Sequence, residues 1–223
     1  MIVSHKHRLI FTHIPKNAGT SIRQWLMEHV PDAQEMPHNP KRRVFLVPHN
    51  PKHDTPHHVH GHSDYTYFAV VRNPYDRLLS QYNFHVERYQ SYLANKRELK
   101  AKTRKKFQDT YAELQKGLSH WLEMDYPMAD RKSKWYDYRW CPQSVWTNER
   151  THVLLYENLT EDFRWVQERV EVDAPLETLN STSTSNDHST MENRVLLANH
   201  RELILSHLLV DFERFGYAPD FNR

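Results

Sequence analysis

The sequence predicts an α/β fold, in which a central parallel sheet is flanked by helices on both faces. Three times along the chain, a short apolar segment is followed by a turn and then by a segment with helical periodicity. The three apolar segments are residues 9–14, 67–72 and 152–156. Each is short and contains β-branched residues, as expected of interior strands. Strands that alternate with helices form parallel sheets covered on both faces, which gives a three-layer fold.

The composition is that of an ordinary globular protein, and we expect one domain over residues 1–223. The net charge is only +2, so charge does not favour nucleic acid as a partner. The single cysteine, Cys141, cannot form an internal disulfide. No apolar run has the length of a membrane span, and the first residues contain no signal-peptide core. These features predict a cytoplasmic protein.

The first strand–turn–helix segment has the features of an anion-binding site. Leu9–Ile14 is the strand, and Pro15 ends it because proline has no N–H donor. Residues 16–19 are the loop, and Thr20 or Ser21 is expected to cap the helix. The apolar positions of that helix fall on one face and are Ile22, Trp25, Leu26 and Val30.

A loop that leads into a helix directs several backbone N–H groups at one point, and such a place binds phosphate. Lys16 adds a mobile positive charge, and Gly19 lets the backbone approach a ligand closely. The hydroxyl groups of Thr20 and Ser21 add donors. The loop is P-loop-like, but Lys16 precedes Gly19, whereas the Walker lysine follows the last glycine. An ordinary turn before a capped helix is the alternative interpretation.

The second segment carries further anion-binding side chains. Asn73 suits the helix cap, Pro74 suits the first helical position, and Asp76 complements the helix dipole. Arg72 stands at the end of the strand and Ser80 lies within the first turns of the helix. We therefore expect two strand–turn–helix units with anion chemistry.

The other elements follow from the same patterns. Residues 31–57 contain six prolines and are expected to be mostly loop. The third strand leads into a helix capped by Thr160, and a polar loop occupies residues 180–190. A last helix is expected over about residues 192–215, and Gly216 ends it.

Two segments suggest contact with a ligand or a partner. Residues 96–106 hold seven basic residues against one acidic residue. A solvated helix face is the ordinary interpretation, and contact with a polyanion is the functional one. Residues 126–150 interleave tryptophan and tyrosine with basic residues, a pattern that suits stacking on sugar rings as well as core packing.

Together, His13–Ser21 and Val71–Ser80 resemble the two signatures of sulfotransferases that use 3′-phosphoadenosine 5′-phosphosulfate (PAPS). The match looks closest to the Golgi carbohydrate sulfotransferases, including the heparan sulfate 2-O-sulfotransferase type, and their bacterial relatives. Four further segments agree in order, namely Cys141-Pro-Gln143, Tyr156-Glu-Asn-Leu159, Leu179-Asn-Ser181 and Asp211-Phe-Glu-Arg-Phe-Gly-Tyr217.

The resemblance implies a PAPS-dependent O-sulfotransferase that needs no metal and acts on a hydroxyl acceptor, expected to be a saccharide. Arg72 and Ser80 would hold the 3′-phosphate, while Asn180 and Ser181 would close over the nucleotide. Asn17-Ala18 departs from the commoner Thr-Gly of the loop. The 5′-phosphosulfate loop would comprise Lys16, Asn17, Ala18, Gly19, Thr20 and Ser21.

The catalytic residues implied by the resemblance are a lysine and a histidine. Lys16 would stabilise the leaving oxygen. Val59-His-Gly-His62 resembles the His-Gly-His of heparan sulfate 2-O-sulfotransferases, in which histidine is the proposed base. His60 and His62 lie on the same side of an extended segment, Asp64 could orient either one, and the sequence does not separate them.

Three other functions stay open at this point. The histidine cluster in residues 49–64 suggests a metal-dependent hydrolase, although its proline-rich, irregular spacing does not resemble a zinc site. A P-loop-like kinase is the second alternative, but the Walker order and an obvious Mg²⁺-binding carboxylate beside the loop are missing. A non-catalytic module that binds polyanions through residues 96–106 is the third.

Overall fold

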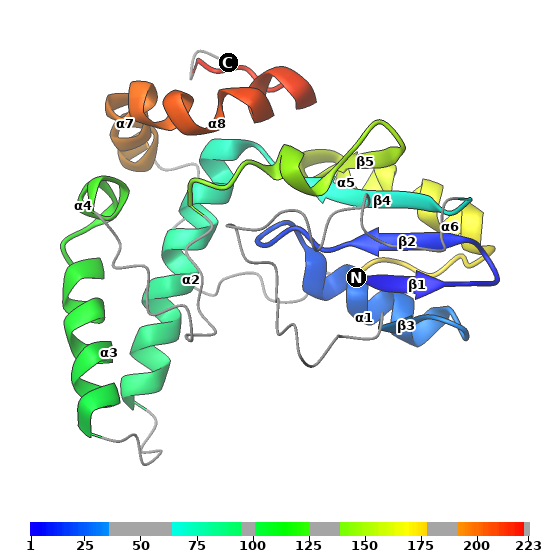
Figure 1. Cartoon of the computed structure of the whole chain (residues 1–223), viewed down its shortest axis with the longest axis horizontal. Helices are drawn as coiled ribbons and strands as arrows, with labels where there is room; N and C mark the ends of the chain where they lie inside the picture. Colours follow the sequence, from blue (N-terminus) through cyan, green and yellow to red (C-terminus); the bar gives the residue numbers. More distant parts are fainter. Residues whose placement is uncertain (36–63, 95–100, 125–138, 178–190, 221–223) are drawn as a thin grey trace. The chain divides into compact units, whose positions relative to one another are not determined.

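A computed structural model of the chain (Figure 1) describes residues 1–35, 64–94, 101–124, 139–177 and 191–220. The chain divides into two compact units. The first comprises Met1–Asn73, Cys141–Ser181 and Val210–Tyr217, and the second comprises Pro74–Trp140, Thr182–Leu209 and Ala218–Arg223. A single domain over the whole chain stays a prediction.

The first unit contains a five-stranded sheet with the order β3-β1-β2-β4-β5. Its strands are β1 (Ile2–Ser4), β2 (Leu9–Thr12), β3 (Gln34–Glu35), β4 (Thr66–Val71) and β5 (Thr151–Leu155). The three predicted strands, β2, β4 and β5, run parallel, which confirms the α/β fold class. The sheet is nevertheless mixed, because β1 pairs antiparallel with both β2 and β3. These two unpredicted strands are too short to show a recognisable periodicity.

Parallel pairing brings the ends of β2 and β4 to the same edge of the sheet. Thr12 pairs with Ala69, and Val71 pairs with Leu155. In Figure 1 the arrowheads of β2 and β4 accordingly point the same way. Ligands of open α/β sheets bind at the carboxyl ends of the strands. The two predicted anion-binding segments both begin at this edge.

Helix α1 (Gly19–His29) packs its predicted apolar face against one face of the sheet. Helix α6 (Arg164–Val170) contributes to the same core, where the rings of Trp25 and Phe163 meet edge-on at a centroid distance of 4.9 Å. Each fully buried apolar side chain of this size stabilises the fold by about 1.5–3 kcal/mol. This core holds the start of α1 firmly against the end of β2. The buried apolar positions contributed by α1 and the residue after it are Ile22, Trp25, Leu26 and Val30.

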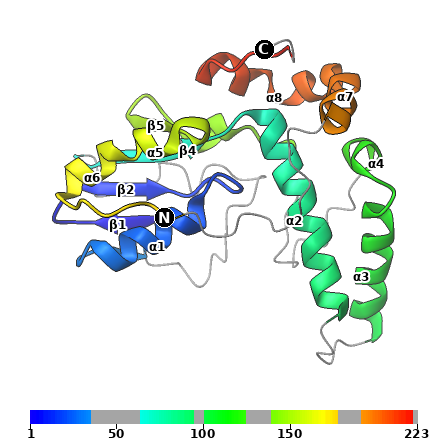
Figure 2. The same cartoon turned by 180° about the vertical axis from the view of Figure 1, so that it is seen from behind.

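The helical segment after β5 differs from its prediction (Figure 2). Helix α5 (Leu159–Asp162) begins before Thr160, and Phe163 separates it from α6. The predicted cap at Thr160 is wrong, because Asn158 holds the cap position without a side-chain hydrogen bond. The carboxylate of Asp162 instead accepts the backbone N–H of Leu155 at 2.7 Å, which ties the helix back to β5.

The described part of the second unit is helical. Helix α2 begins at Pro74 with Asp76 in its first turn, as predicted. Helices α2 and α3 lie side by side in both views, and the hydroxyl of Tyr82 donates to the carbonyl of Leu114 at 3.0 Å. No helix in the described ranges combines the length and the apolar content needed to cross a membrane. The helices are α2 (Pro74–Ala94), α3 (Ala101–Leu114), α4 (Leu118–Glu123), α7 (Met191–Asn199) and α8 (Arg201–Phe215), whose last residues belong to the first unit.

The last helix was predicted as one element but is interrupted at His200. The two ring nitrogens of His200 lie 2.8 Å from the carbonyl of Leu196 and 2.8 Å from the carboxylate of Glu123. The ring of His200 thereby ties the break between α7 and α8 to Glu123, the last residue of α4. Gly216 follows α8 with φ 73°, as expected of a residue that ends a helix.

Candidate functional site

The loop between β2 and α1 holds two residues in the left-handed region of backbone conformation. Lys16 has φ 73° and Ala18 has φ 56°, although neither is glycine. A left-handed L-residue costs about 1–2 kcal/mol, and such strain clusters at ligand-binding sites. Left-handed residues in a tight turn also gather successive N–H groups around a concavity that binds anions. The backbone of this loop therefore supports the predicted anion site.

Helix α1 begins at Gly19, and the residue in the cap position is Ala18, with no side-chain cap hydrogen bond. The prediction that Thr20 or Ser21 caps the helix is therefore wrong. The left-handed Ala18 turns the chain directly into the helix, so both hydroxyl residues lie in its first turn. That turn contains no acidic residue, and its first N–H groups have no partner within the helix. The helix dipole and these donors together favour a bound anion.

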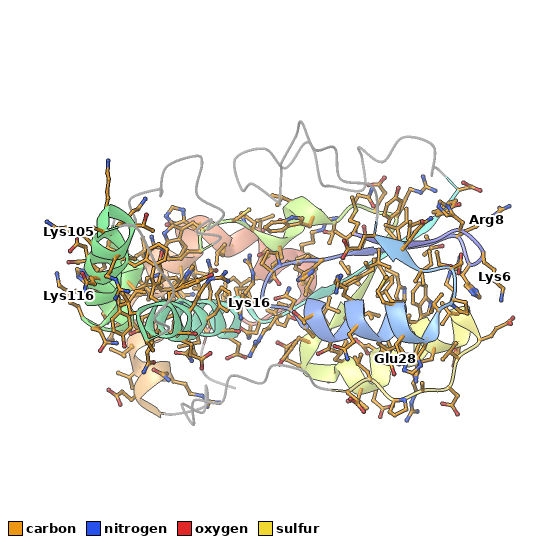
Figure 3. All side chains as sticks on the ribbon, turned by 90° about the horizontal axis from the view of Figure 1, so that it is seen from below. Lys6, Arg8, Lys16, Glu28, Lys105 and Lys116 are labelled. Carbon is orange, nitrogen blue, oxygen red and sulfur yellow. The ribbon has the colours of Figure 1, made fainter. Side chains whose placement is uncertain are left out.

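Lys16 lies in the same loop, beside the first turn of α1 (Figure 3), and is half-buried. The ammonium group of a lysine is a compact charge on a flexible stem, so it can follow negative charge on a ligand that backbone amides hold. The structure thus brings Lys16 and the N–H groups of the loop into one place. This is the arrangement that the sequence predicts.

Gly19 has a structural role in addition to its predicted one. A Cβ atom at position 19 would lie only 2.1 Å from Nε2 of His13 and 2.2 Å from its Cδ2. The imidazole ring therefore occupies the space that a larger residue would need. The ring also stacks on Phe11, with a centroid distance of 6.0 Å and an interplanar angle of 22°. His13 thereby fixes the end of β2 against the start of α1.

Burial is the main cause that lowers the pKa of His13 from its ordinary value of 6.5 to about 4, and the positive charges of the N-terminus, Arg23 and Lys16 contribute to the same shift. The unfolded chain therefore binds a proton near pH 6.5, whereas the folded chain binds it only near pH 4. Consequently, the free energy of unfolding should fall as the pH drops through this window. Between pH 7.5 and pH 4.5, we expect the free energy of unfolding of His13→Gln to fall by on the order of 2 kcal/mol less than that of the wild type. Urea unfolding of both proteins at the two pH values measures this, and equal losses for both proteins would contradict the expectation.

Arg72 directly follows β4 and is the second predicted anion-binding residue. Its side chain is 8% exposed, and the guanidinium carbon lies 4.1 Å from the centroid of the Tyr156 ring. Among the described residues, no carboxylate pairs with the guanidinium, and Nε has no hydrogen-bond partner. A guanidinium that is stacked but not neutralised by a protein carboxylate suits a phosphate ligand.

The side chain of Asn17 points into the protein and connects the loop to β4. It is 1% exposed. Its amide nitrogen donates to the carbonyl of Val70 at 2.8 Å and to Oε1 of Gln143 at 2.6 Å. The residue therefore offers a ligand its backbone N–H rather than its side chain. Asn17 also fixes the distance between the loop and the end of β4.

Gln143 contacts both Asn17 and Arg72, and the three residues form a buried cluster with Asp211. Gln143 comes from a third segment, in which it is the first residue of the 3₁₀ helix η3 (Gln143–Trp146). Its Oε1 accepts the N–H of Arg72 at 2.9 Å, and its Nε2 donates to the carbonyl of Arg72 at 2.8 Å. Asp211 on α8 is fully buried and accepts the backbone N–H of Gln143 at 2.6 Å. Leaving one such buried group without a partner costs about 1–3 kcal/mol, so removal of the Gln143 amide should be costly.

Glu157 holds the residue after Arg72. One carboxylate oxygen accepts the N–H of Asn73 at 2.7 Å, and the other accepts the hydroxyl of Tyr217 at 2.9 Å. The local sequence patterns assign no role to Gln143, Glu157, Asp211 or Tyr217. These residues belong to three of the four further segments that resemble sulfotransferases, and this shared membership is the signal that could have pointed to them. In the structure, the segments of Gln143 and Glu157 contact Arg72 and Asn73, and the segment of Asp211 and Tyr217 contacts Gln143 and Glu157.

The remaining predicted site residues are placed differently. Ser80 is buried on α2, in the second unit, whereas Arg72 belongs to the first. Asp64, predicted to orient a histidine, is exposed and pairs with Arg8 at 3.2 Å. The predicted residues outside the described ranges are His60, His62, Asn180 and Ser181.

The structure describes no candidate metal centre. Within the described ranges, no three His, Cys, Asp or Glu side chains gather in a way that could hold a metal ion. The histidines of residues 49–62 lie outside those ranges. The groups that the structure does bring together are donors and cations, which bind anions rather than metals.

Comparisons with known proteins agree with an anion-binding enzyme. The chain matches the model of the Sulfotransferase family over residues 1–218, which include both anion-binding segments and the segments around Arg72. Neither the curated proteins nor the solved structures yielded a match. The family match spans nearly the whole chain. The chain therefore belongs to the sulfotransferase family and is an enzyme that uses PAPS as its sulfuryl donor.

Proposed function

We propose that this enzyme transfers the sulfuryl group of PAPS to a hydroxyl group of a carbohydrate, and that the β2–α1 loop and Arg72 bind the donor. The observation that carries the proposal is the placement of two anion-binding segments at one edge of the sheet. The strained loop with Lys16 follows β2, and the stacked Arg72 follows the neighbouring parallel strand β4. PAPS has anionic groups at two ends, so it needs two such sites.

The loop is assigned to the 5′-phosphosulfate end of the donor. During transfer, the bond between sulfur and the bridging phosphate oxygen breaks, and a bond between sulfur and the acceptor oxygen forms. Lys16 neutralises the charge that develops on the departing oxygen, as donors in a preorganised site do. The loop N–H groups hold the phosphate while this occurs. The residues of this assignment are Lys16, Asn17, Ala18, Gly19, Thr20 and Ser21.

Arg72 is assigned to the 3′-phosphate, because a guanidinium can hold a terminal phosphate through two parallel hydrogen bonds. Ser80 adds a hydroxyl donor to the same phosphate. Asn180 and Ser181 are assigned to the segment that closes over the nucleotide. The last three assignments rest on the resemblance of the sequence to other sulfotransferases.

The hydroxyl proton of the acceptor is assigned to a histidine, either His60 or His62. A histidine titrates near neutral pH, so its neutral form can accept this proton under ordinary conditions. The pH–rate profiles of His60→Ala and His62→Ala separate the two, because only the variant that lacks the base should lose the limb near pH 6–7.

An anionic saccharide is the acceptor that best fits the basic run. The described part of that run is the first half of α3, where Lys102, Arg104, Lys105 and Lys106 follow one another closely (Figure 3 labels Lys105). The lysines are exposed. Consecutive cations on an exposed helix attract polyanions in a salt-dependent manner. Sulfated or carboxylated glycans are therefore the first acceptors to screen.

Two linked measurements test the function. We expect calorimetry to show that 3′-phosphoadenosine 5′-phosphate (PAP) binds at least about tenfold more tightly than ATP, because only PAP presents both phosphates correctly. We then expect labelled PAPS to transfer sulfate to members of a panel of neutral and acidic saccharides, with EDTA present.

Each alternative function predicts a different result. Binding of ATP with Mg²⁺ and phosphoryl transfer would reject the proposal in favour of a kinase. Activity that EDTA abolishes and stoichiometric zinc restores would support a metal site in residues 49–64. Salt-sensitive binding of glycans without any sulfate transfer would indicate a polyanion-binding module.

A further inference from the structure

We propose that Gln143, held in place by Asp211, is a positioning residue that couples the two anion-binding segments of the donor site. This inference rests on the proposed assignment of the β2–α1 loop and Arg72 to the two ends of PAPS. It adds that the two ends do not bind independently. One buried side-chain amide connects them, so the position of each segment depends on the other.

The orientation of the Gln143 amide is fixed by the main chain of Arg72. Oε1 accepts the N–H of Arg72 at 2.9 Å, and Nε2 donates to its carbonyl at 2.8 Å. A flipped amide would place acceptor against acceptor and donor against donor, so only one orientation is allowed. The side chain therefore pairs with Arg72 as a peptide group of a neighbouring strand would. It sets the position of the backbone that carries the guanidinium.

The same Oε1 atom makes the connection to the loop. It accepts a second hydrogen bond from Nδ2 of Asn17 at 2.6 Å, and the other proton of that nitrogen goes to the carbonyl of Val70 at 2.8 Å. Both acceptors require a donor, so the amide of Asn17 is also oriented uniquely. Asn17 lies between the two left-handed residues of the loop. Any movement of Arg72 is thereby transmitted to the strained part of the loop.

This connection requires a side chain at position 17 that can donate two hydrogen bonds at once. A threonine hydroxyl has a single proton and can donate only one hydrogen bond at a time. It could not satisfy both the Val70 carbonyl and the Gln143 amide oxygen, which are buried. The asparagine is therefore matched to Gln143 in this chain.

Asp211 fixes the backbone that carries the side-chain amide of Gln143. Its two carboxylate oxygens accept the backbone N–H of Gln143 at 2.6 Å and that of Ser144 at 2.9 Å. These are the first two N–H groups of η3, which have no partner within that helix. The residues Asn17, Gln143 and Asp211 are at most 1% exposed, so water does not compete for their hydrogen bonds. The cluster consequently acts as one unit.

A coupled site binds a ligand with both phosphates better than two separate sites of the same strength would. Four ligands measure this property: PAP, adenosine 5′-monophosphate, adenosine 3′-monophosphate and adenosine. The coupling factor is the product of the Kd values of the two monophosphates divided by the product of those of PAP and adenosine. The advantage of joining both phosphates to one adenosine is the same for every variant. A change in the coupling factor between variants therefore reflects a change in how the protein connects its two sites.

The test compares Gln143→Met with the matched control Gln167→Met. Gln167 makes a single hydrogen bond from Nε2 to the carbonyl of Ala174 at 2.7 Å, on α6 of the same unit. We expect the coupling factor to fall by at least about tenfold in Gln143→Met, mainly because the Kd of PAP rises. In Gln167→Met it should change by less than about twofold. Calorimetry supplies both the Kd and the fraction of protein that binds.

The possible results separate this inference from the proposed function. A lower binding fraction with an unchanged coupling factor would mean that Gln143 is merely structural, and the inference would be overturned. A wild-type protein that binds PAP no better than adenosine 5′-monophosphate would overturn the proposed function itself. If Gln143→Met does not fold, Asn17→Ala replaces it, because alanine has no donor and this variant removes both hydrogen bonds of the Asn17 amide while Gln143 and Asp211 stay in place. An unchanged coupling factor in Asn17→Ala would overturn the inference equally.

Discussion

Replacement of Lys16 by alanine is expected to lower kcat by about 10²–10³-fold, while the Kd of PAP rises by less than about tenfold. The charge of the lysine is needed most when the bond between sulfur and the bridging oxygen breaks. On the proposed assignment it contributes less to ground-state binding, because the N–H groups of the loop and of the first turn of α1 would also hold the phosphate. Alanine keeps the Cβ atom, so the strain at φ 73° is retained. Single-turnover transfer of labelled sulfate and calorimetry with PAP measure the two effects.

Lys6→Ala is the matched control for this experiment. Lys6 is exposed and precedes β2, whereas Lys16 follows it. The two lysines are therefore separated by the length of one strand, and the control should keep its wild-type rate. Turnover close to that of the wild type in Lys16→Ala would show that the leaving oxygen is stabilised by another group.

Replacement of Arg72 by alanine is expected to raise the Kd of PAP by about 100-fold. The variant loses the stacking on Tyr156 and, on the proposed assignment, both hydrogen bonds to the 3′-phosphate. Adenosine 5′-monophosphate lacks the 3′-phosphate, so its Kd should change by less than about threefold. Calorimetry with the two nucleotides distinguishes a lost 3′-phosphate site from a general disturbance of the donor site.

Two further variants sharpen this result. Arg72→Lys should recover only a small part of the loss, because an ammonium neither stacks on a ring as a guanidinium does nor forms two parallel bonds. Arg164→Ala removes an exposed arginine that pairs with Glu161 at 3.1 Å, and it should leave both Kd values unchanged. An equal loss of affinity for the two nucleotides in Arg72→Ala would refute the assignment to the 3′-phosphate.

Local patterns were sufficient to predict the elements that carry the site. The buried strands β2 and β4 are apolar runs, and Pro74 marks the start of α2 because its fixed φ and missing N–H suit a first helical position. The spacing of Ile22, Trp25 and Leu26 predicted which face of α1 is buried. The order Lys16 before Gly19 separated the loop from a Walker loop.

Features that depend on distant residues could not be predicted from such patterns. Ala18 is left-handed although nothing in the alanine side chain favours this conformation, so the sequence does not predict it. Gln143 looks like an ordinary polar residue in the sequence, yet its partner Arg72 lies 71 positions away. Glu157 likewise bonds to the backbone of Asn73 from 84 positions away. Periodicity and propensity describe neighbours in the chain, so they contain no information on these contacts.

The buried cluster around Gln143 also determines when the enzyme becomes competent during its synthesis. Asn17 is made before its partner Gln143, which follows 126 residues later, and Asp211 follows Gln143 after another 68. Contacts of such high sequence separation form late, because long loops must close first. A growing chain that has not yet released α8 from the ribosome therefore has the loop, Arg72 and Gln143 but lacks the carboxylate that fixes Gln143. We expect tight binding of the donor only after α8 has been made.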